Sequence, residues 1–319
     1  MTILKGLYKI KYNLLYTKCN LFRKGYKGML QVRQRAYAKI NIGLDVLRRR
    51  PDGYHEVKMI MQTVGIYDDL LIEKCEKPGI FLQIDKEELP TDQNNLIYKA
   101  AQLLLTEKKI QEGVRISLTK RIPIAAGMAG GSSDAAAALR GMNELFNLGY
   151  QTQELQKIGV KLGADIPYCI VGGTMLSEGI GEILTPLPTP PGCTLVIAKP
   201  DINVSTKFVY ENLHADTLSY HPDIDGMIKA LREGSLKGIT DRLGNVLETV
   251  TTREYPVIEE IKKLMRENGA ENALMSGSGP TVFGIFTQEK KAQEAARQLR
   301  DRNLARQVFV TEFQEDING

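Results

Sequence analysis

The chain has 319 residues, of which 43% are hydrophobic and 25% are charged, and its formal net charge is +4. These values are ordinary for a soluble globular protein and suit one large or two ordinary domains. No apolar run approaches the roughly 18 residues that a membrane-spanning helix needs. Four scattered cysteines and three histidines argue against a zinc cluster, and we expect a cytoplasmic protein.

The first 30 residues differ from the rest, because they hold seven lysines and arginines and no acidic residue. A basic tail can bind nucleic acid or an anionic membrane surface, and a targeting segment is a further interpretation. The simplest interpretation is a gene start placed too early, with the true start at Met29. We therefore treat residues 1–30 as a basic extension without an assigned function.

The elements of the first half are predicted from hydrophobic periodicity and turn residues. The charged segment 48–53 is a turn. Strands are expected over residues 32–46, 54–66, 69–74, 80–84 and 114–120. Helices are expected over residues 95–105 and 152–162, and a third begins near residue 132.

A proline-rich stretch over residues 185–192 is the best domain junction, which predicts domains over 31–184 and 185–319. After it, the pattern predicts strands over residues 194–198, 272–276, 281–286 and 307–311. Helices are predicted near residues 206–212, 224–232, 256–267 and 289–300. This second half is typical of a two-layer α+β sandwich.

Residues 123–139 read PIAAGMAGGSSDAAAAL, a small-residue loop that leads into an alanine-rich helix. Ser132, Ser133 and Asp134 are favoured at helix N-caps. A glycine-rich turn before a helix gathers free backbone N–H groups and the positive end of the helix dipole, which suits a phosphate. It is not a P-loop, because Ser132 follows the glycine pair where lysine would stand. The alternative is a tight turn that only packs the helix.

Three shorter motifs accompany this loop, and each has a structural alternative. Lys39 and Asn41 share one face of the first strand, which suits a polar ligand or a solvated face. Asp165, in GADIPY, suits either a general base or an Asx turn or helix cap. Residues 275–281, MSGSGPT, form either a loop packed under another loop or an ordinary hairpin turn.

In this order the motifs resemble those of the GHMP kinases, and the resemblance covers about residues 33–312. It implies an α+β, two-domain GHMP kinase fold, with an N-terminal ribosomal-protein-S5-like domain and a C-terminal ferredoxin-like α/β sandwich. The segment RPDGYHE over residues 50–56 resembles the branch that acts on diphosphocytidyl-methylerythritol in the non-mevalonate isoprenoid pathway. Tyr54 would stack on the cytosine ring, and His55 would bond its polar edge.

The resemblance also implies the remaining roles. Asp165 would be the general base for transfer of phosphate from ATP to a 2-hydroxyl, and Lys39 would be its partner. Asn41 and Thr206 would contact the substrate, and either Phe208 or Tyr210 would close the cytosine site. The expected ATP-binding residues are Asn95, Ile124, Ala125, Ala126, Gly127, Met128, Ala129, Gly130, Gly131, Ser132, Ser133 and Asp134. Mg²⁺ is expected beside the phosphates, with Ser133 as its protein contact.

Two alternatives remain open at this point. One is a GHMP kinase that acts on a smaller alcohol of the homoserine or mevalonate type. The other is a nucleic-acid-binding module, given the basic tail and the ribosomal-protein-like half. We expect a small-molecule substrate, no nucleic-acid or membrane partner, and a monomer or a homodimer.

Overall fold

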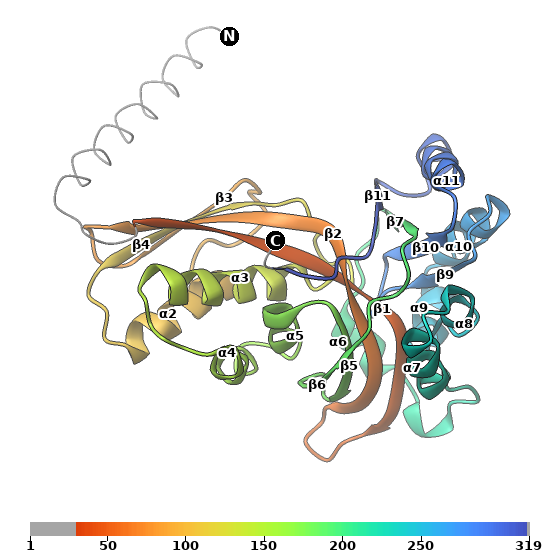
Figure 1. Ribbon diagram of the computed structural model, residues 1–319, viewed down its shortest axis with the longest axis horizontal. Helices are drawn as coiled ribbons and strands as arrows, with labels where there is room; N and C mark the ends of the chain where they lie inside the picture. Colours follow the sequence, from red (N-terminus) through yellow and green to blue (C-terminus); the bar gives the residue numbers. More distant parts are fainter. Residues whose placement is uncertain (1–29, 318–319) are drawn as a thin grey trace, which may run out of the picture.

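The computed structural model describes residues 30–317, so the predicted basic extension lies outside the described residues except for Leu30. The described chain is built around two β-sheets, each with helices against it (Figure 1). No helix in residues 30–317 combines the length and the apolar character that crossing a membrane requires.

The first sheet has the strand order β3-β4-β2-β1-β8, and β5 joins it by pairing with β2 and β6. Its strands are β1 (Gln31–Arg49), β2 (His55–Cys75), β3 (Ile80–Ile84), β4 (Gly113–Thr119), β5 (Thr174–Gly179), β6 (Ile183–Leu187) and β8 (Gly244–Asn245). The long β1–β2 hairpin runs from this sheet toward the second domain (Figure 1).

The pairing of β1 with β2 has three register shifts, and two of them decide where the side chains in the middle of β1 point. These two lie between Tyr37 and Lys39 and between Asn41 and Gly43. A bulge inserts an extra residue and changes the face that the following side chains occupy. Ile40 therefore packs in one hydrophobic cluster, whereas Ala36 and Leu44 pack in the other. The three-residue segment between the shifts is the one that carries Lys39 and Asn41.

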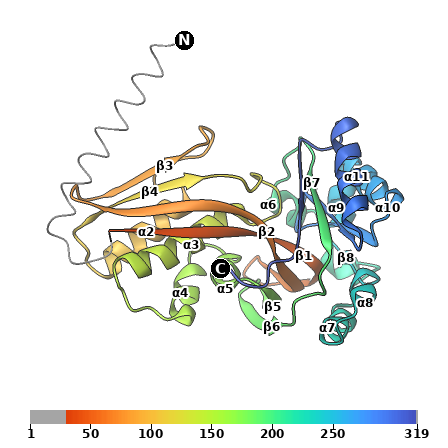
Figure 2. The same ribbon diagram turned by 45° about the horizontal axis from the view of Figure 1, so that its top comes forward.

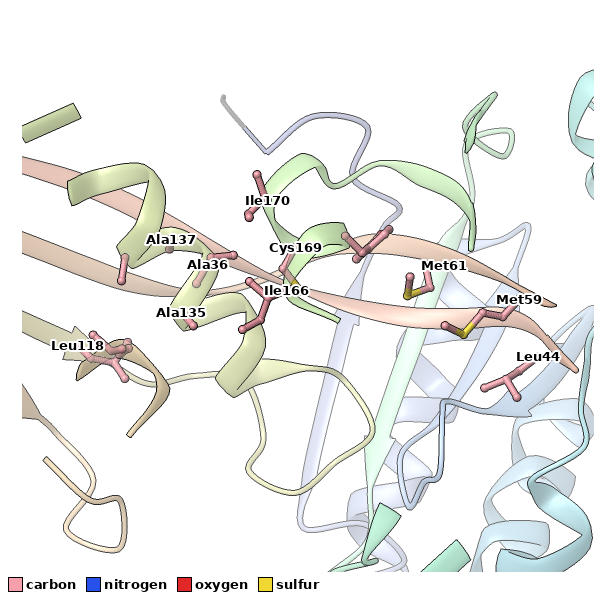
Figure 3. Packing of buried hydrophobic residues seen from close by; sticks show 14 of the residues in the cluster. Ala36, Leu44, Met59, Met61, Leu118, Ala135, Ala137, Ile166, Cys169 and Ile170 are labelled. Carbon is pink, nitrogen blue, oxygen red and sulfur yellow. The ribbon is translucent and has the colours of Figure 1, made fainter. Parts of the chain in front are cut away.

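Helices cover one face of the first sheet (Figure 2). They are α2 (Leu96–Glu107), α3 (Gly130–Leu145), α4 (Thr152–Gly159) and α5 (Ile166–Val171). Alanines 135 to 138 of α3 are fully buried, and their small side chains let α3 lie close to β1 and α5 (Figure 3). This packing holds α3 and α5 against β1, the strand that carries Lys39 and Asn41.

The second sheet is antiparallel throughout, with the order β11-β7-β10-β9. Its strands are β7 (Thr194–Lys199), β9 (Asn272–Met275), β10 (Val282–Phe286) and β11 (Gln307–Thr311). The helices of this half are α6 (Thr206–Glu211), α7 (Ile224–Arg232), α8 (Leu236–Thr240), α9 (Glu248–Glu254), α10 (Val257–Glu267) and α11 (Glu289–Asp301), with a short 3-10 turn at Ala215–Thr217. Of these, α10 and α11 pack on the second sheet, whereas α7 contacts β1, β2 and β6 of the first. With α10 and α11, these strands form the βαββαβ order of a ferredoxin-like sandwich, which confirms the predicted α+β class.

Several predicted elements need correction. The strands predicted over 54–66 and 69–74 are one strand, because Asp68 is buried within β2 and ion-paired with Lys120. The helix predicted over 152–162 ends at Gly159, and α5, β5, β6, α8, β8 and α9 were not predicted. The predicted junction also divides a strand, since β6 still belongs to the first sheet and the second sheet begins at Thr194.

Candidate active site

A cavity of about 1040 Å³ lies where the two domains meet. Its walls come from β1, the loop before α3, the start of α5, the start of α6 and the loop after β9. Pockets of roughly 300–1,000 Å³ hold drug-sized ligands, so this cavity has room for an extended ligand or for two smaller ones. The sequence motifs, which lie far apart in the chain, meet in this one place.

Lys39 and Asn41 point into this cavity from β1, as the strand pattern predicted. Both side chains are buried, and the Lys39 Nζ donates to Asn41 Oδ1 at 2.8 Å. The Asn41 amide also donates to the Met59 sulfur at 3.2 Å. Within residues 30–317 the Lys39 ammonium forms no ion pair with a carboxylate, and a buried ammonium of this kind is a strong attractor for an anionic ligand. The solvated-face alternative is wrong, because both side chains are buried.

The glycine-rich loop is held in a left-handed conformation at three alternating positions. Ala125, Gly127 and Ala129 have φ values of 50°, 69° and 55°. Left-handed residues between right-handed or extended ones turn successive N–H groups toward one side and create an anion-binding concavity. At Gly127 a Cβ would lie 2.3 Å from the Ser276 carbonyl oxygen, so only glycine fits there.

The helix after this loop begins earlier than predicted. Ala129 occupies the N-cap position of α3, and no side chain caps this end. Ser132, Ser133 and Asp134 therefore lie within the first turns of the helix, and their prediction as N-caps was wrong. An uncapped N-terminus leaves its backbone N–H groups available to a ligand.

Two loop residues do not reach the cavity. Met128 is buried in a hydrophobic cluster, and its carbonyl accepts the Lys39 backbone N–H at 3.2 Å. The Ser133 hydroxyl is also buried and donates to the Tyr37 carbonyl at 2.6 Å. Both residues fasten the loop to β1. The predicted loop residues that do line the cavity are Ile124, Ala125, Ala126, Gly127, Ala129, Gly130, Gly131, Ser132 and Asp134.

Asp165 lines the cavity at the start of α5. It stands at the N-cap position, but its side chain makes no capping hydrogen bond. No side-chain hydrogen bond from another residue in the described range 30–317 reaches its half-buried carboxylate. Burial is the larger cause of the raised pKa of Tyr210, and the negative charge of Asp165 is the second cause, so the two residues are near one another. The carboxylate is free to act on a ligand.

Tyr54, His55 and Tyr210 form an aromatic end of the cavity. Tyr54 is 59% exposed at the β1–β2 turn, and the His55 and Tyr210 rings lie 5.1 Å apart at 41°. Burial, followed by the nearby positive charge of Arg49, lowers the pKa of His55. The imidazole is therefore neutral at pH 7 and offers one donor and one acceptor. Of the two aromatic residues considered for this end, Tyr210 lines the cavity and Phe208 does not.

Thr206, at the start of α6, and Asn95, before α2, also line the cavity. The Thr206 hydroxyl lies 2.9 Å from the Ser278 hydroxyl, which connects α6 to the loop after β9. Asn95 caps α2, since its Oδ1 accepts from Ile97 N at 2.8 Å and its amide donates to the Pro90 carbonyl at 2.8 Å. The Asn95 side chain therefore has its main partners within the protein.

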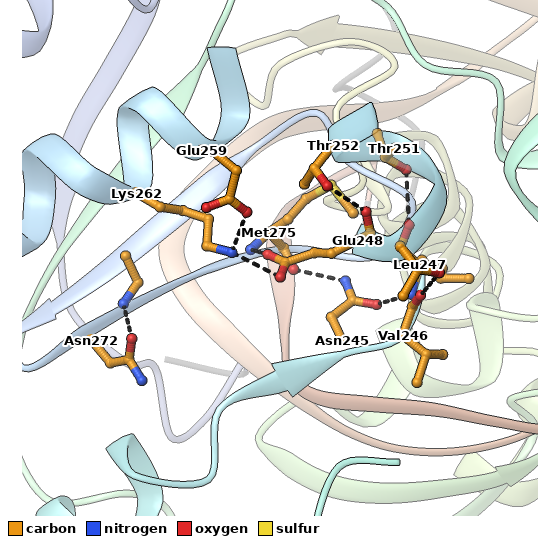
Figure 4. A network of polar contacts seen from close by, with 12 residues as sticks. Asn245, Val246, Leu247, Glu248, Thr251, Thr252, Glu259, Lys262, Asn272 and Met275 are labelled. Carbon is orange, nitrogen blue, oxygen red and sulfur yellow. Dashed lines mark hydrogen bonds and ion pairs between the residues drawn. The ribbon is translucent and has the colours of Figure 1, made fainter. Parts of the chain in front are cut away.

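A polar network holds the loop after β9, with side chains from β8, α9 and α10 (Figure 4). The Asn245 amide donates to the carbonyls of Met275 and Gly277, at 2.8 Å each. Glu248 accepts from Met275 N and from Lys262, both at 2.8 Å. The network fixes the position of residues 276–278, of which Gly277 and Ser278 line the cavity. The segment is the hairpin connection between the antiparallel strands β9 and β10, and it also packs against the glycine-rich loop through Ser276 and Gly127.

Sequence reasoning missed Lys120 and Asp68, and it did not predict that Asp134 pairs with Lys120. The buried Lys120 ammonium contacts Asp68 and Asp134, the latter at 2.8 Å, and Lys120 and Asp134 line the cavity. Burial raises the pKa of Asp134 to about 8 against the opposing effect of Lys120. For Lys120, burial alone would lower the pKa, but the effects of Asp134 and Asp68 together are larger, so the pKa of the lysine is raised. An acidic residue between two apolar, strand-like segments was the available signal, because a buried acid needs a partner.

Comparison with known families and structures agrees with this geometry. Residues 95–173 match the GHMP kinases N terminal domain, and residues 227–304 match the GHMP kinases C terminal domain. The chain is 51% identical over 284 residues to a 4-diphosphocytidyl-2-C-methyl-D-erythritol kinase of Lachnoclostridium phytofermentans, covering 89% of this chain and 98% of that one. A protein of the same name from Lachnospira eligens is 52% identical, covering 89% and 99%.

Solved structures give the same result. A crystal structure of a 4-(cytidine 5'-diphospho)-2C-methyl-D-erythritol kinase matches with a TM-score of 0.76 and 33% identity, over 88% of this chain and 99% of that one. The mevalonate kinase of L. major, solved with R-mevalonate, matches with a TM-score of 0.71 and 18% identity, over 92% and 98%. The second match shows a shared fold alone.

Proposed function

Because this chain belongs to the 4-diphosphocytidyl-2-C-methyl-D-erythritol kinases of the GHMP family, we propose that it transfers the terminal phosphate of ATP to the 2-hydroxyl of 4-diphosphocytidyl-2-C-methyl-D-erythritol. This step belongs to the non-mevalonate route to isoprenoid precursors. One observation carries the proposal: the same cavity is lined by the glycine-rich loop before α3, by Lys39 and Asp165, and by the aromatic side chains of Tyr54, His55 and Tyr210.

The reaction is a displacement at phosphorus. Asp165 accepts the proton of the 2-hydroxyl, and the resulting oxygen attacks the γ-phosphorus of ATP. The bond from that phosphorus to the β–γ bridging oxygen breaks, and ADP leaves. Lys39 lies close to the transferred group and neutralises part of its charge, while Asn41 fixes the lysine and the substrate. Positioning and charge neutralisation supply most of the catalysis in phosphoryl transfer.

The ATP phosphates occupy the concavity of residues 124–134 in this proposal. Backbone N–H groups of the left-handed loop and the uncapped end of α3 face the cavity there. The adenine lies toward Asn95, beside Leu89, Pro90 and Leu96. Because the Asn95 side chain is occupied by its cap, that contact is made mainly by apolar surface and backbone.

Mg²⁺ enters this proposal with the nucleotide, and it would supply charge neutralisation at the phosphates. Residues 30–317 hold no group of three acidic, histidine or cysteine side chains that could bind a metal by themselves. The Ser133 hydroxyl is directed at the Tyr37 carbonyl, so it does not fit the expected metal contact. Of the loop residues that line the cavity, Ser132 and Asp134 carry side-chain oxygens. These residues fit a metal held chiefly by phosphate oxygens and water.

The cytidine base lies at the aromatic end. Tyr54 and Tyr210 offer apolar ring faces, and the neutral His55 can donate to and accept from the polar edge of a pyrimidine. Thr206 lies between this end and the loop after β9, where it can contact the substrate diphosphate. A homoserine- or mevalonate-type alcohol would leave this end of the cavity without a partner.

Other properties remain predictions. We expect a monomer or a homodimer in the cytoplasm, without a nucleic-acid or membrane partner.

The test is ADP release by the full chain with ATP and Mg²⁺, measured with each of three acceptors. We expect turnover with the cytidylated methylerythritol and only background with homoserine or mevalonate. Equal or faster turnover with either smaller alcohol would contradict the proposed substrate.

A further inference from the structure

Three buried residues connect the two ends of the glycine-rich loop. The Lys120 side chain, which is 4% exposed, sits directly before the loop and contacts both Asp68 and Asp134. Asp68 also accepts the backbone N–H groups of Arg121 and of Ile122, the latter at 2.8 Å. Asp68 therefore holds the start of the loop, and Asp134 lies just after its end, in α3.

The first helical residue of α3 makes room for the ammonium. At Gly130 a Cβ would lie 2.9 Å from Lys120 Nζ and 3.1 Å from the Ile122 side chain. A larger residue would have to displace the ammonium from its two carboxylates. Gly130 has no positive φ, so close approach of Lys120 explains the glycine better than backbone conformation does.

Asp134 carries a second, independent sign that this cluster faces a ligand. Its Oδ1 atom is buried, lies in a residue that lines the cavity, and has no hydrogen-bond partner. Most buried polar atoms are paired, and an exception of this kind is typical of a functional site.

We propose that Lys120 is a positioning residue for ATP, because it clamps residues 121–134 into the conformation that presents their N–H groups to the phosphates. Asp68 and Asp134 hold the ammonium, and Gly130 leaves space for it. This inference rests on the proposed role of the loop as the ATP phosphate site, and it adds a residue that does not itself need to touch the transferred phosphate.

A matched pair of variants separates this role from simple stabilisation. Lys74 on β2 is another largely buried lysine, 14% exposed, whose ammonium pairs with the Glu112 carboxylate at 3.5 Å, but it does not line the cavity. Lys120→Met and Lys74→Met each remove a largely buried ammonium from a carboxylate. Both should lower the melting temperature, whereas only Lys120→Met should weaken nucleotide binding.

The measurement is calorimetric titration of the full chain with ATP in EDTA, well below the melting temperature of each variant. We expect Lys120→Met to raise the ATP Kd at least tenfold and Lys74→Met to leave it within twofold of wild type. The KM for the cytidylated substrate should stay unchanged in both. A folded Lys120→Met protein with a wild-type Kd would overturn the inference.

Gly130→Ala supplies a second route if Lys120→Met does not fold, because its Cβ displaces the same ammonium. It should also raise the ATP Kd, and an unchanged Kd would overturn the inference. Where both single variants fold, the double variant should bind ATP as weakly as Lys120→Met alone. Additive losses would mean that the two residues act independently, which contradicts the clamp. Failure of wild type to bind ATP when Mg²⁺ replaces EDTA would instead refute the proposed function.

Discussion

The Ser276 hydroxyl donates to the Gly127 carbonyl at 3.0 Å and accepts the Asn41 backbone N–H at 3.3 Å. One fully buried side chain thus joins the loop after β9, the phosphate-type loop and the strand that carries Lys39. The contact spans 149 residues of sequence and both domains. It ties the proposed ATP end of the cavity to the proposed acceptor end.

Removal of this hydroxyl should impair both ends together. Ser276→Ala leaves the Asn41 N–H and the Gly127 carbonyl without their side-chain partner, at about 1–3 kcal/mol for each unsatisfied buried group. We expect a lower free energy of unfolding, a higher ATP KM and a lower kcat. Denaturant unfolding and steady-state kinetics measure these effects.

Ser235→Ala is the control, because Ser235 caps α8 away from the cavity and its loss costs about 1 kcal/mol of stability. It should leave both kinetic constants unchanged. Equal kinetic effects in the two variants would show that Ser276 acts only through stability.

Asp165→Asn should abolish turnover while ATP binding remains. The amide cannot accept the proton of the substrate hydroxyl, and general-base catalysis is typically worth about 10²–10⁴-fold in rate. The side chain makes no capping hydrogen bond, so stability should change little. Single-turnover kinetics and ATP titration measure the two effects, with the exposed Asp201→Asn as the control. A kcat near that of wild type would exclude Asp165 as the base.

Tyr54→Ala should weaken binding of the cytidylated substrate. Stacking of a base on an aromatic ring is worth about 1–3 kcal/mol, which predicts a rise in KM of roughly 5- to 150-fold. Tyr220 offers a matched control, since it is 54% exposed against 59% for Tyr54 but does not line the cavity. If Tyr220→Ala raised the KM as much as Tyr54→Ala, the stacking role would be refuted.

The KM for the cytidylated substrate should depend on pH through His55. Burial and Arg49 lower the pKa of this imidazole from its ordinary value of about 6.5. The neutral form therefore persists at pH 6.5 and is lost only as the pH falls further, and protonation removes the hydrogen-bond acceptor. We expect the KM to rise in wild type as the pH falls below 6.5. In His55→Gln this rise should be absent, and an unchanged pH profile would assign it to another group.

The local features of the site could be predicted from the sequence. The loop before α3, the Lys39–Asn41 face and the turn at Asp165 each depend on residues close together in the chain, where period and turn chemistry decide the conformation. Lys39 and Asn41 do share a face, because no register shift falls between them and the strand alternation therefore holds over this short segment. The bulges themselves have no local signature, so the change of face on either side could not be predicted.

Long-range pairings could not be predicted. Residues 66 to 69 suggested a break between strands, because the sequence does not show that Asp68 is neutralised by a lysine 52 residues later. The six-residue α5 is too short for a periodic pattern, and its packing against α3 stabilises it instead. Ser133 looked like a ligand contact, but the proximity of β1 gives its hydroxyl a backbone partner.

The central claim is that one cavity brings an acceptor hydroxyl of a cytidylated substrate to the terminal phosphate of ATP beside Asp165 and Lys39. The most direct measurement is phosphorus and carbon NMR of the product formed by the full chain from ATP and 4-diphosphocytidyl-2-C-methyl-D-erythritol. We predict one new phosphomonoester signal per ADP formed, retained diphosphate signals, and phosphorus coupling at carbon 2. A phosphate on another oxygen, or release of inorganic phosphate alone, would contradict the account.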